Sequence, residues 1–255
     1  AERGLVAEGP FRCVAAGDVN KDGFVDFFLG GAGPSSLALS DGRGGFGVVP
    51  APEETAGAEA AQFVDYDADG LLDLFVVSAN GTRLLRYRGS SGKDVSAAAF
   101  ADRLRTAALE GAALALADLD ADGDQDAIVA TPGRLLSLTN EGGSHNRSFA
   151  VDLVGRVSNK GGVGAKVEIR AGSLRQKIET SAAVPMVAPA DVVFGLGART
   201  SPDAVRVIWV SGIVQTETEF PEATTEATRT ATHLLELDRK PSSCPYLDAW
   251  DGERF

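Results

Sequence analysis

An acidic nine-residue pattern, D-x-[DN]-x-D-G-x-x-D, occurs three times in the chain. It reads DVNKDGFVD over residues 18–26, DYDADGLLD over 65–73 and DLDADGDQD over 118–126, the first, second and third acidic loops. A single copy would be as well explained by a solvent-exposed turn rich in Asp, Asn and Gly. Three copies are poorly explained by chance, so the pattern limits the folds that the chain can adopt.

The spacing of the oxygen-bearing side chains suits a hard cation. Oxygens from the first, third, fifth and ninth residues, with the main-chain carbonyl of the seventh, can surround one Ca²⁺, and glycine at the sixth residue permits a sharp turn. We therefore predict three Ca²⁺ sites, and we expect the side chain of Asp124 to point outward. The predicted ligands are Asp18, Asn20, Asp22, Phe24 and Asp26 in the first loop, Asp65, Asp67, Asp69, Leu71 and Asp73 in the second, and Asp118, Asp120, Asp122, Asp124 and Asp126 in the third.

The acidic loops differ from an EF-hand, which begins with the same spacing. An EF-hand needs a bidentate Glu at the twelfth position and a helix on each side, whereas the twelfth residues here are Leu29, Val76 and Val129. The runs after the loops, FFLGG, LFVVS and AIVAT, are short and rich in β-forming residues. We therefore predict that each acidic loop joins two β-strands.

A longer repeat surrounds the acidic loops. Their first residues, Asp18, Asp65 and Asp118, are 47 and 53 residues apart, and a further apolar stretch follows each loop: SLALSDG, RLLRYRG and RLLSLTNEGG. Each unit therefore reads strand, acidic loop, strand, turn, strand. This period predicts blades of a β-propeller or, alternatively, units stacked as a β-solenoid.

Residues 95–111, VSAAAFADRLRTAALEG, interrupt this pattern. The stretch is rich in Ala and other good helix formers, so we expect a short surface helix or helical turn. Phe100, Leu104 and Leu109 would then pack inward.

The acidic loops stop at about residue 145, and alternating β patterns follow. In AKVEIRA, Val167 and Ile169 share a face, and in AVRVIWV, Val205, Val207 and Trp209 do so. We predict three calcium-binding blades over residues 1–145, a small all-β, sandwich-like domain over 146–238, here called the C-terminal unit, and a tail or the start of a further segment over 239–255. The Thr-rich stretch PEATTEATRT within the C-terminal unit is expected to be an exposed loop.

The charge of the chain is concentrated in the acidic loops. The formal net charge is −12, and the three loops contain twelve Asp residues. This acidity therefore belongs to ion sites, and the absence of a Lys/Arg cluster argues against a nucleic-acid partner. No apolar stretch approaches the ~18 residues that span a bilayer, so we expect a soluble chain without a membrane span.

Several features leave alternatives open. The start AERGLVAEGP has no apolar core, so a signal peptide has been removed or the chain begins inside a longer precursor. Cys13 and Cys244 could form a disulfide or be two buried thiols. Asn80 and Asn146 lie in N-glycosylation sequons, although plain Asn-containing turns are the favoured interpretation.

These motifs resemble a known combination of domains. The acidic loops look like the FG-GAP/VCBS repeats of integrin-α-type propellers. The stretches LVGRVSNKGGVGAKVEIRAG (153–172), VVFGLG (192–197) and AVRVIWVSGIVQ (204–215) resemble the ASPIC/UnbV domain of cartilage acidic protein-like proteins of the bacterial type. The chain departs from that pattern at Val210, where Pro is usual, and three repeats are fewer than the ~4 blades that close a propeller. It could be a fragment, contain a degenerate fourth blade, or pair its open edges with another chain.

The sequence offers little for catalysis. His145 and His233 are the two histidines, neither lies in a recognisable nucleophile motif, and there is no phosphate-binding glycine loop or zinc-ligand spacing. A cytosolic calcium sensor is disfavoured because strand-flanked loops offer no helix pair to open. We therefore expect a non-enzymatic, calcium-stabilised extracellular module for binding, adhesion or assembly, whose partner is another protein chain, a glycan or a copy of itself. The alternative is a propeller-type carbohydrate-active enzyme or an accessory subunit of one.

Overall fold

The structure is a computed structural model of the chain, and it describes residues 4–5, 7–89, 95–106, 110–120, 122–141, 146–180, 192–220 and 229–238. This part of the chain forms five β-sheets and two short 3₁₀ turns, η1 (Glu53–Thr55) and η2 (Ala97–Ala99). The predicted all-β class is therefore confirmed. No helix within these residues has the length and apolar character to cross a membrane.

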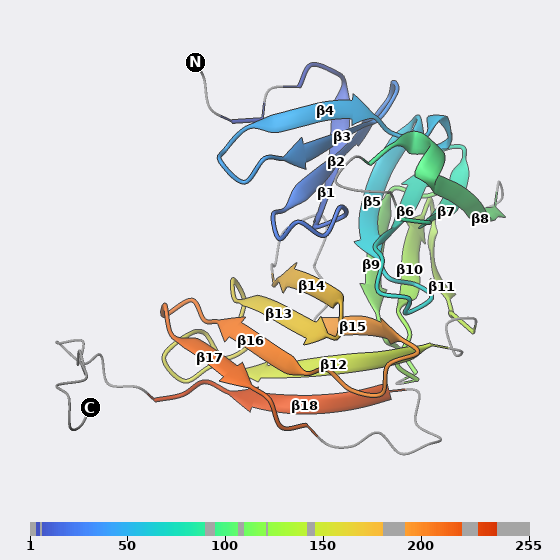
Figure 1. Cartoon of the computed structure of the whole chain (residues 1–255). Coiled ribbons are helices and arrows are strands. Elements are labelled where there is room, and N and C mark those ends of the chain that lie inside the picture. The colour runs from blue at the N-terminus through green and yellow to red at the C-terminus, as the bar shows by residue number, and fades with distance from the viewer. Residues whose placement is uncertain are drawn as a thin grey trace, which may run out of the picture.

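The first two sheets are four-stranded antiparallel meanders, in which strands that follow one another in sequence are paired (Figure 1). The first sheet contains β1 (Phe11–Gly17), β2 (Asp26–Gly31), β3 (Ser36–Ser40) and β4 (Phe46–Pro50), and the second contains β5 (Ala58–Val64), β6 (Asp73–Ser78), β7 (Gly81–Tyr87) and β8 (Phe100–Thr106). The third sheet repeats the first three strands of this arrangement, with β9 (Ala113–Ala117), β10 (Asp126–Thr131) and β11 (Arg134–Leu138).

The three sheets pack face to face through their apolar residues, as propeller-type blades do. One core cluster lies between the first and second sheets and includes Phe28, Leu37 and Leu74, and another lies between the second and third and includes Phe75 and Val129. The second sheet is thus covered on both faces, which explains why every residue of β6 is buried. The blade interpretation is confirmed, and the stacked-solenoid alternative is wrong.

The short helix or helical turn expected within residues 95–111 is present only as the single turn η2, and the expectation is wrong for the residues that follow. These form β8, which pairs with β7. The open edge of β7 offers main-chain partners that outweigh the helix propensity of this Ala-rich stretch. Phe100 stacks on Tyr87 with ring centroids 5.0 Å apart, and Leu104 packs against the second-to-third-sheet core, so both point inward as predicted. Leu109 lies outside the described residues.

The C-terminal unit is a two-sheet sandwich. One sheet has the order β15 (Val192–Gly197), β12 (Arg147–Val154), β18 (Arg229–Leu235), and β12 and β18 run parallel. The other has the order β14 (Leu174–Glu179), β13 (Lys166–Ala171), β16 (Ala204–Ile208), β17 (Val214–Glu217). A shared core contains the predicted inward-facing residues Val167, Ile169, Val205, Val207 and Trp209, each no more than 1 % exposed. Most of the Thr-rich stretch lies outside the described residues, although its last two residues begin β18.

A buried carboxylate closes one end of this sandwich. Glu236 is 1 % exposed and follows β18. It accepts hydrogen bonds from the main-chain N–H groups of Arg156, Val157 and Ser158 at 2.7, 2.8 and 2.7 Å, and from the hydroxyls of Ser158 and Ser211 at 2.8 and 2.6 Å. Burial by itself raises the pKa of Glu236, but the hydrogen bonds from Ser211, Ser158 and Arg156 outweigh it and lower the pKa to about 2. Glu236 therefore ties the 155–164 turn and the 209–213 turn to the end of β18.

The residues left open by the sequence are placed as follows. Val210 is exposed, and the turn around it still closes, because Gly212 N–H donates to Trp209 O (2.8 Å). Cys13 is a buried thiol of β1 whose burial raises its pKa to about 11, and Cys244 lies outside the described residues. Asn80 is exposed in the turn between β6 and β7.

Candidate metal centre

The three acidic loops have the same local architecture. Each connects the first and second strands of its blade, and its ninth residue, Asp26, Asp73 or Asp126, is the first residue of the second strand. The sixth residue has a left-handed backbone, with φ of 91° at Gly23, 92° at Gly70 and 101° at Gly123. Glycine adopts this conformation without the steric cost of a Cβ, which explains its place in the pattern.

The ninth-position aspartates are fixed by main-chain hydrogen bonds. Asp26, Asp73 and Asp126 are 0, 0 and 1 % exposed. One carboxylate oxygen accepts from the N–H of the second loop residue, and the other from an N–H 14 residues further along, at the end of the third strand. The donors to the first oxygen are Val19 (3.1 Å), Tyr66 (3.3 Å) and Leu119 (2.8 Å), and those to the second are Ser40 (2.8 Å), Tyr87 (2.7 Å) and Asn140 (2.8 Å). Each aspartate therefore holds its loop to the first three strands, a role that the spacing alone did not indicate.

The first-position aspartates accept from the loop glycine. The N–H groups of Gly23, Gly70 and Gly123 donate to Oδ2 of Asp18 (2.9 Å), Asp65 (2.8 Å) and Asp118 (3.2 Å). In the first loop, the other oxygen of Asp18 also accepts, from Asp22 N–H at 3.0 Å. In the second and third loops, Oδ1 of Asp65 and of Asp118 is buried, and no donor to it is found among the residues that the structure describes.

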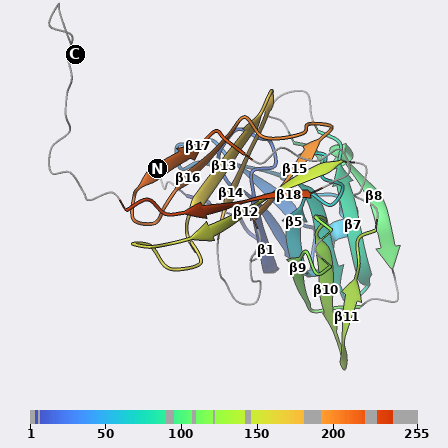
Figure 2. The same ribbon diagram turned by 90° about the horizontal axis from the view of Figure 1, so that it is seen from below.

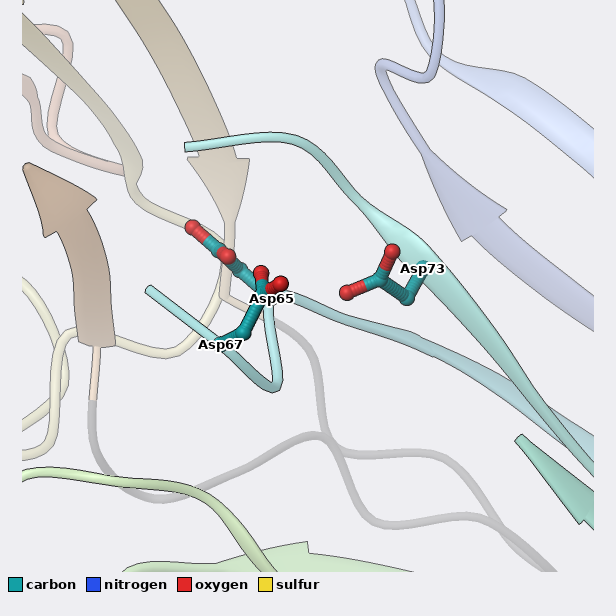
Figure 3. Close-up of side chains that lie close together, drawn as sticks. All are labelled: Asp65, Asp67 and Asp73. Atoms are coloured by element: carbon teal, nitrogen blue, oxygen red, sulfur yellow. The ribbon is translucent and has the colours of Figure 1, made fainter. Parts of the chain in front are cut away.

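Two groups of carboxylates are found, and within each group the side chains lie close enough together to bind one cation. Asp65, Asp67 and Asp73 each offer an oxygen within 4.8 Å of the others, and Asp118, Asp120 and Asp126 do the same. Figure 3 shows the Asp73 carboxylate reaching from the start of β6 toward Asp65 and Asp67. The structure thus brings together the first, third and ninth positions of these two loops. Among the described residues, the first loop, with Asn20 at its third position, has no such group of three acidic side chains.

The fifth-position aspartates lie outside these two groups. Asp69 Oδ2 accepts from Arg86 Nη2 at 2.8 Å, and Arg86 Nε lies 2.7 Å from Asp67 Oδ2. The other Asp69 oxygen accepts from Leu71 N–H, and Asp122 accepts from Asp124 N–H at 2.9 Å. Ligation by the fifth position and by the seventh-position carbonyls remains a prediction.

The expected outward orientation of Asp124 is wrong. This residue is 7 % exposed. It immediately precedes Gln125 and the start of β10, where the chain turns into the sheet, so the main-chain path rather than the polarity of the side chain decides its direction.

The carboxylates are electrostatically unfavourable in the absence of a cation. Burial raises the pKa of Asp73 to about 9 and that of Asp26 to about 6. Burial, together with the negative charge of Asp69, raises the pKa of Asp65 to about 8. A bound cation reverses this effect because it stabilises the ionised form.

The donor set fits a hard cation. The buried oxygens Asp65 Oδ1, Asp67 Oδ1 and Asp118 Oδ1 have no hydrogen-bond donor within the described part of the chain, and each belongs to a residue of the two convergent groups. A buried acceptor without a donor is costly, and ligation to a metal ion satisfies it. The second and third acidic loops could therefore each hold a metal ion.

Residues far from the pattern also contribute to the loops. Arg229, in β18 of the C-terminal unit, forms an ion pair with Asp118, and Lys21, of the first loop, donates to Gly70 O in the second. Asn146 Nδ2 donates to Asp67 O at 2.7 Å, so the amide of this sequon is already engaged. No local signal in the sequence predicts these contacts, because each joins residues that are distant along the chain.

Comparisons with known families agree with the geometry. A model of the FG-GAP-like repeat matches residues 18–76 and 65–129, and each match begins at the first Asp of one acidic loop and ends within the strand that follows the next. A model described as ASPIC and UnbV matches residues 155–229. The search of curated proteins found no match.

Proposed function

Because this chain is an FG-GAP-like repeat protein with a C-terminal ASPIC/UnbV domain, we propose that it is a calcium-stabilised extracellular module for binding or assembly, without catalytic activity. The domain content by itself suggests an extracellular module of the β-propeller type. Calcium dependence, the absence of catalysis and the nature of the partner are the further steps of this proposal.

The buried, unpaired oxygen of Asp118 carries the proposal. The Asp118 side chain is 0 % exposed, its Oδ2 accepts from Gly123 and Arg229, and no described residue donates to its Oδ1. Asp120 and Asp126 place further oxygens within 4.8 Å. A cation held by these three residues supplies the missing partner and links the loop to the start of β10.

Calcium is the cation that this ligand set suits best. Ca²⁺ accepts about 6–8 oxygen ligands in flexible geometry, whereas Mg²⁺ demands near-octahedral coordination with metal–oxygen distances of about 2.0–2.1 Å. Three sites are proposed, with the first loop the weakest, because both Asp18 oxygens already accept main-chain hydrogen bonds. The Ca²⁺ sites of extracellular modules have dissociation constants of about 0.1–1 mM, and sites of this affinity suit an extracellular location.

The absence of catalysis is supported by how the described titratable groups are used. The side chain of His233 is 79 % exposed, and its Nδ1 lies 3.0 Å from a carboxylate oxygen of Asp152, its exposed partner on the neighbouring strand. The acidic groups that converge belong to the loops, where pairing with a cation accounts for them. The partner is proposed to be another protein chain, a glycan or a second copy of this chain.

Calorimetric titration of the full chain with Ca²⁺ tests the proposal. We expect about three binding events in the chain as it stands, and one fewer in Asp120→Ala, which removes the oxygen ligand of an exposed member of the third group. Asp152→Ala is the matched control, because it removes a carboxylate from an exposed position of β12. A chain that binds no Ca²⁺, or an Asp120→Ala variant with unchanged stoichiometry and affinity, would show that the loops are not calcium sites.

A further inference from the structure

All three acidic loops face the C-terminal unit. In the first loop, Lys177 Nζ of β14 donates to Gly23 O at 3.2 Å. In the second, Gly197 N–H of β15 donates to Ala68 O at 2.8 Å, and in the third, Arg229 of β18 pairs with Asp118. Figures 1 and 2 show the strands of the C-terminal unit lying across the loop ends of the blades.

Gly195, in β15, lies directly against the second acidic loop. A Cβ built at this residue would lie 2.6 Å from Ala68 Cα and closer still to Asp65 Oδ2, whereas real Cβ contacts essentially never fall below 3.0 Å. Gly195 is not among the residues with positive φ, so its backbone conformation does not require glycine. The requirement arises from the second acidic loop, which packs directly on this backbone.

The contact is mutual and held from both sides. The carbonyl of Gly195 accepts from Gln176 Nε2 at 2.6 Å, which fixes β15 against β14. On the loop side, a Cβ at Gly70 would lie 2.8 Å from Leu174 Cδ1. A glycine in the loop and a glycine in β15 therefore allow the two backbones to meet over Asp65.

This contact places the main chain of the C-terminal unit against a convergent carboxylate group. Asp65 belongs to the group with Asp67 and Asp73, and the Oδ1 atoms of Asp65 and Asp67 receive no hydrogen bond from the residues placed in the structure. Covering ionised groups without a counter-charge is costly, so a cation bound between the carboxylates would favour the covered state. Two cations of the chain offset part of this charge: Arg86 contacts Asp67 and Asp69, and Lys21 donates to Gly70 O close to Asp65.

We propose that the cation-loaded acidic loops are the docking surface for the chain's own C-terminal unit, with Gly195 as the residue that permits docking on the second loop. This inference rests on the metal binding proposed above and adds a partner for the loops, namely a segment of the same chain. Because coupling is reciprocal, cations strengthen docking and docking strengthens cation binding by the same factor.

Gly195→Ala tests the coupling, with Gly161→Ala as the matched control. Gly161 belongs to the same unit, has no positive φ and has nothing within 4 Å of a built Cβ. In calorimetric titrations of the full chain, Gly195→Ala should weaken the affinity for Ca²⁺ at one site about tenfold, the usual size of such coupling, and Gly161→Ala should not.

Small-angle X-ray scattering of the unaltered full chain gives a readout that does not depend on how the variant folds. We expect the radius of gyration to increase when Ca²⁺ is removed by a chelator, while far-ultraviolet circular dichroism retains the β signal. An unchanged radius of gyration, or equal Ca²⁺ affinity in Gly195→Ala and the unaltered chain, would overturn the coupling while leaving calcium binding intact. A chain that binds no Ca²⁺ would overturn both proposals.

Discussion

Replacing Glu236 by Gln should destabilise the folded chain by about 3 kcal/mol. Lowering a carboxyl pKa from 4.5 to about 2 corresponds to about 3 kcal/mol of preference for the ionised form. Gln keeps the size of the side chain and removes the charge, so the variant loses this preference. Glu236 is 1 % exposed, and solvent therefore screens little of the effect.

The geometry shows why an amide is a poor replacement. Three main-chain N–H groups, of Arg156, Val157 and Ser158, converge on Oε2. Gln must therefore place its oxygen there and direct its NH₂ group at the hydroxyls of Ser158 and Ser211, which would have to reverse from donors to acceptors. The remaining hydrogen bonds are neutral and weaker than those to a carboxylate.

Urea unfolding of the full chain in Ca²⁺-containing buffer measures the difference. Glu219→Gln, at an exposed position near the end of the same unit, is the control for loss of one negative charge. The folded-state pKa of Glu236 is depressed, so its contribution is present above about pH 4.5 and is lost as the pH falls toward about 2. The stability difference between Glu236→Gln and the unaltered chain should therefore shrink over that interval.

Two results would refute this reasoning. One is a Glu236→Gln variant within about 0.5 kcal/mol of the unaltered chain at neutral pH, the range usual for unimportant surface changes. The other is a stability difference that does not change as the solution is acidified, which would mean that packing rather than charge distinguishes the two side chains.

Three further predictions follow from the loops and the sheet edge. In the presence of a chelator, Asp73→Ala should still lower the free energy of urea unfolding by about 2 kcal/mol, because two main-chain donors lose their acceptor. Asp69→Ala should lower it by less than about 1 kcal/mol. Equal effects of the two substitutions would contradict the assigned roles. The folded-state pKa values of Asp65 and Asp73 are raised to about 8 and about 9, so the metal-free chain should lose stability as the pH rises. Removal of metal by a chelator should therefore lower the melting temperature more at about pH 8 than at about pH 6. A larger decrease at about pH 6 would refute this prediction. Leu135 is 72 % exposed on β11, an edge strand of the three-stranded sheet. If copies of the chain associate through this edge, Leu135→Lys should abolish the association measured by light scattering. An unaltered chain that is already monomeric would exclude this edge as an assembly surface.

The loops and the strands beside them were predictable because their signals are local. The spacing of Asp and Gly fixes the loop turn, and the alternation in AKVEIRA and AVRVIWV fixes which side chains, such as Val167 and Val205, face the core. β8 was mistaken for a helix because its residues have helix propensity, and only the neighbouring β7 edge decides the outcome. Pairing with β7 overrides a helix propensity on the order of 0.5 kcal/mol per residue.

The contacts that complete the candidate site were not predictable from local patterns. Glu236 bonds to residues 78–80 positions earlier, and Asp118 pairs with Arg229 across 111 positions. Gly195 reads as an ordinary glycine within VVFGLG, because the atoms that exclude a Cβ belong to a loop more than a hundred residues away. Only the assembled sheets bring these groups together.

The ninth-position aspartate suggests how such blades can change over evolutionary time. Asp26, in the loop without three convergent carboxylates, makes the same two main-chain contacts as Asp73 and Asp126. Loss of acidic residues at the earlier positions would therefore abolish ion binding and leave the blade its shape. Blades that have lost ion binding should retain a single Asp at the start of their second strand. Sequence searches that require the complete motif would overlook such blades.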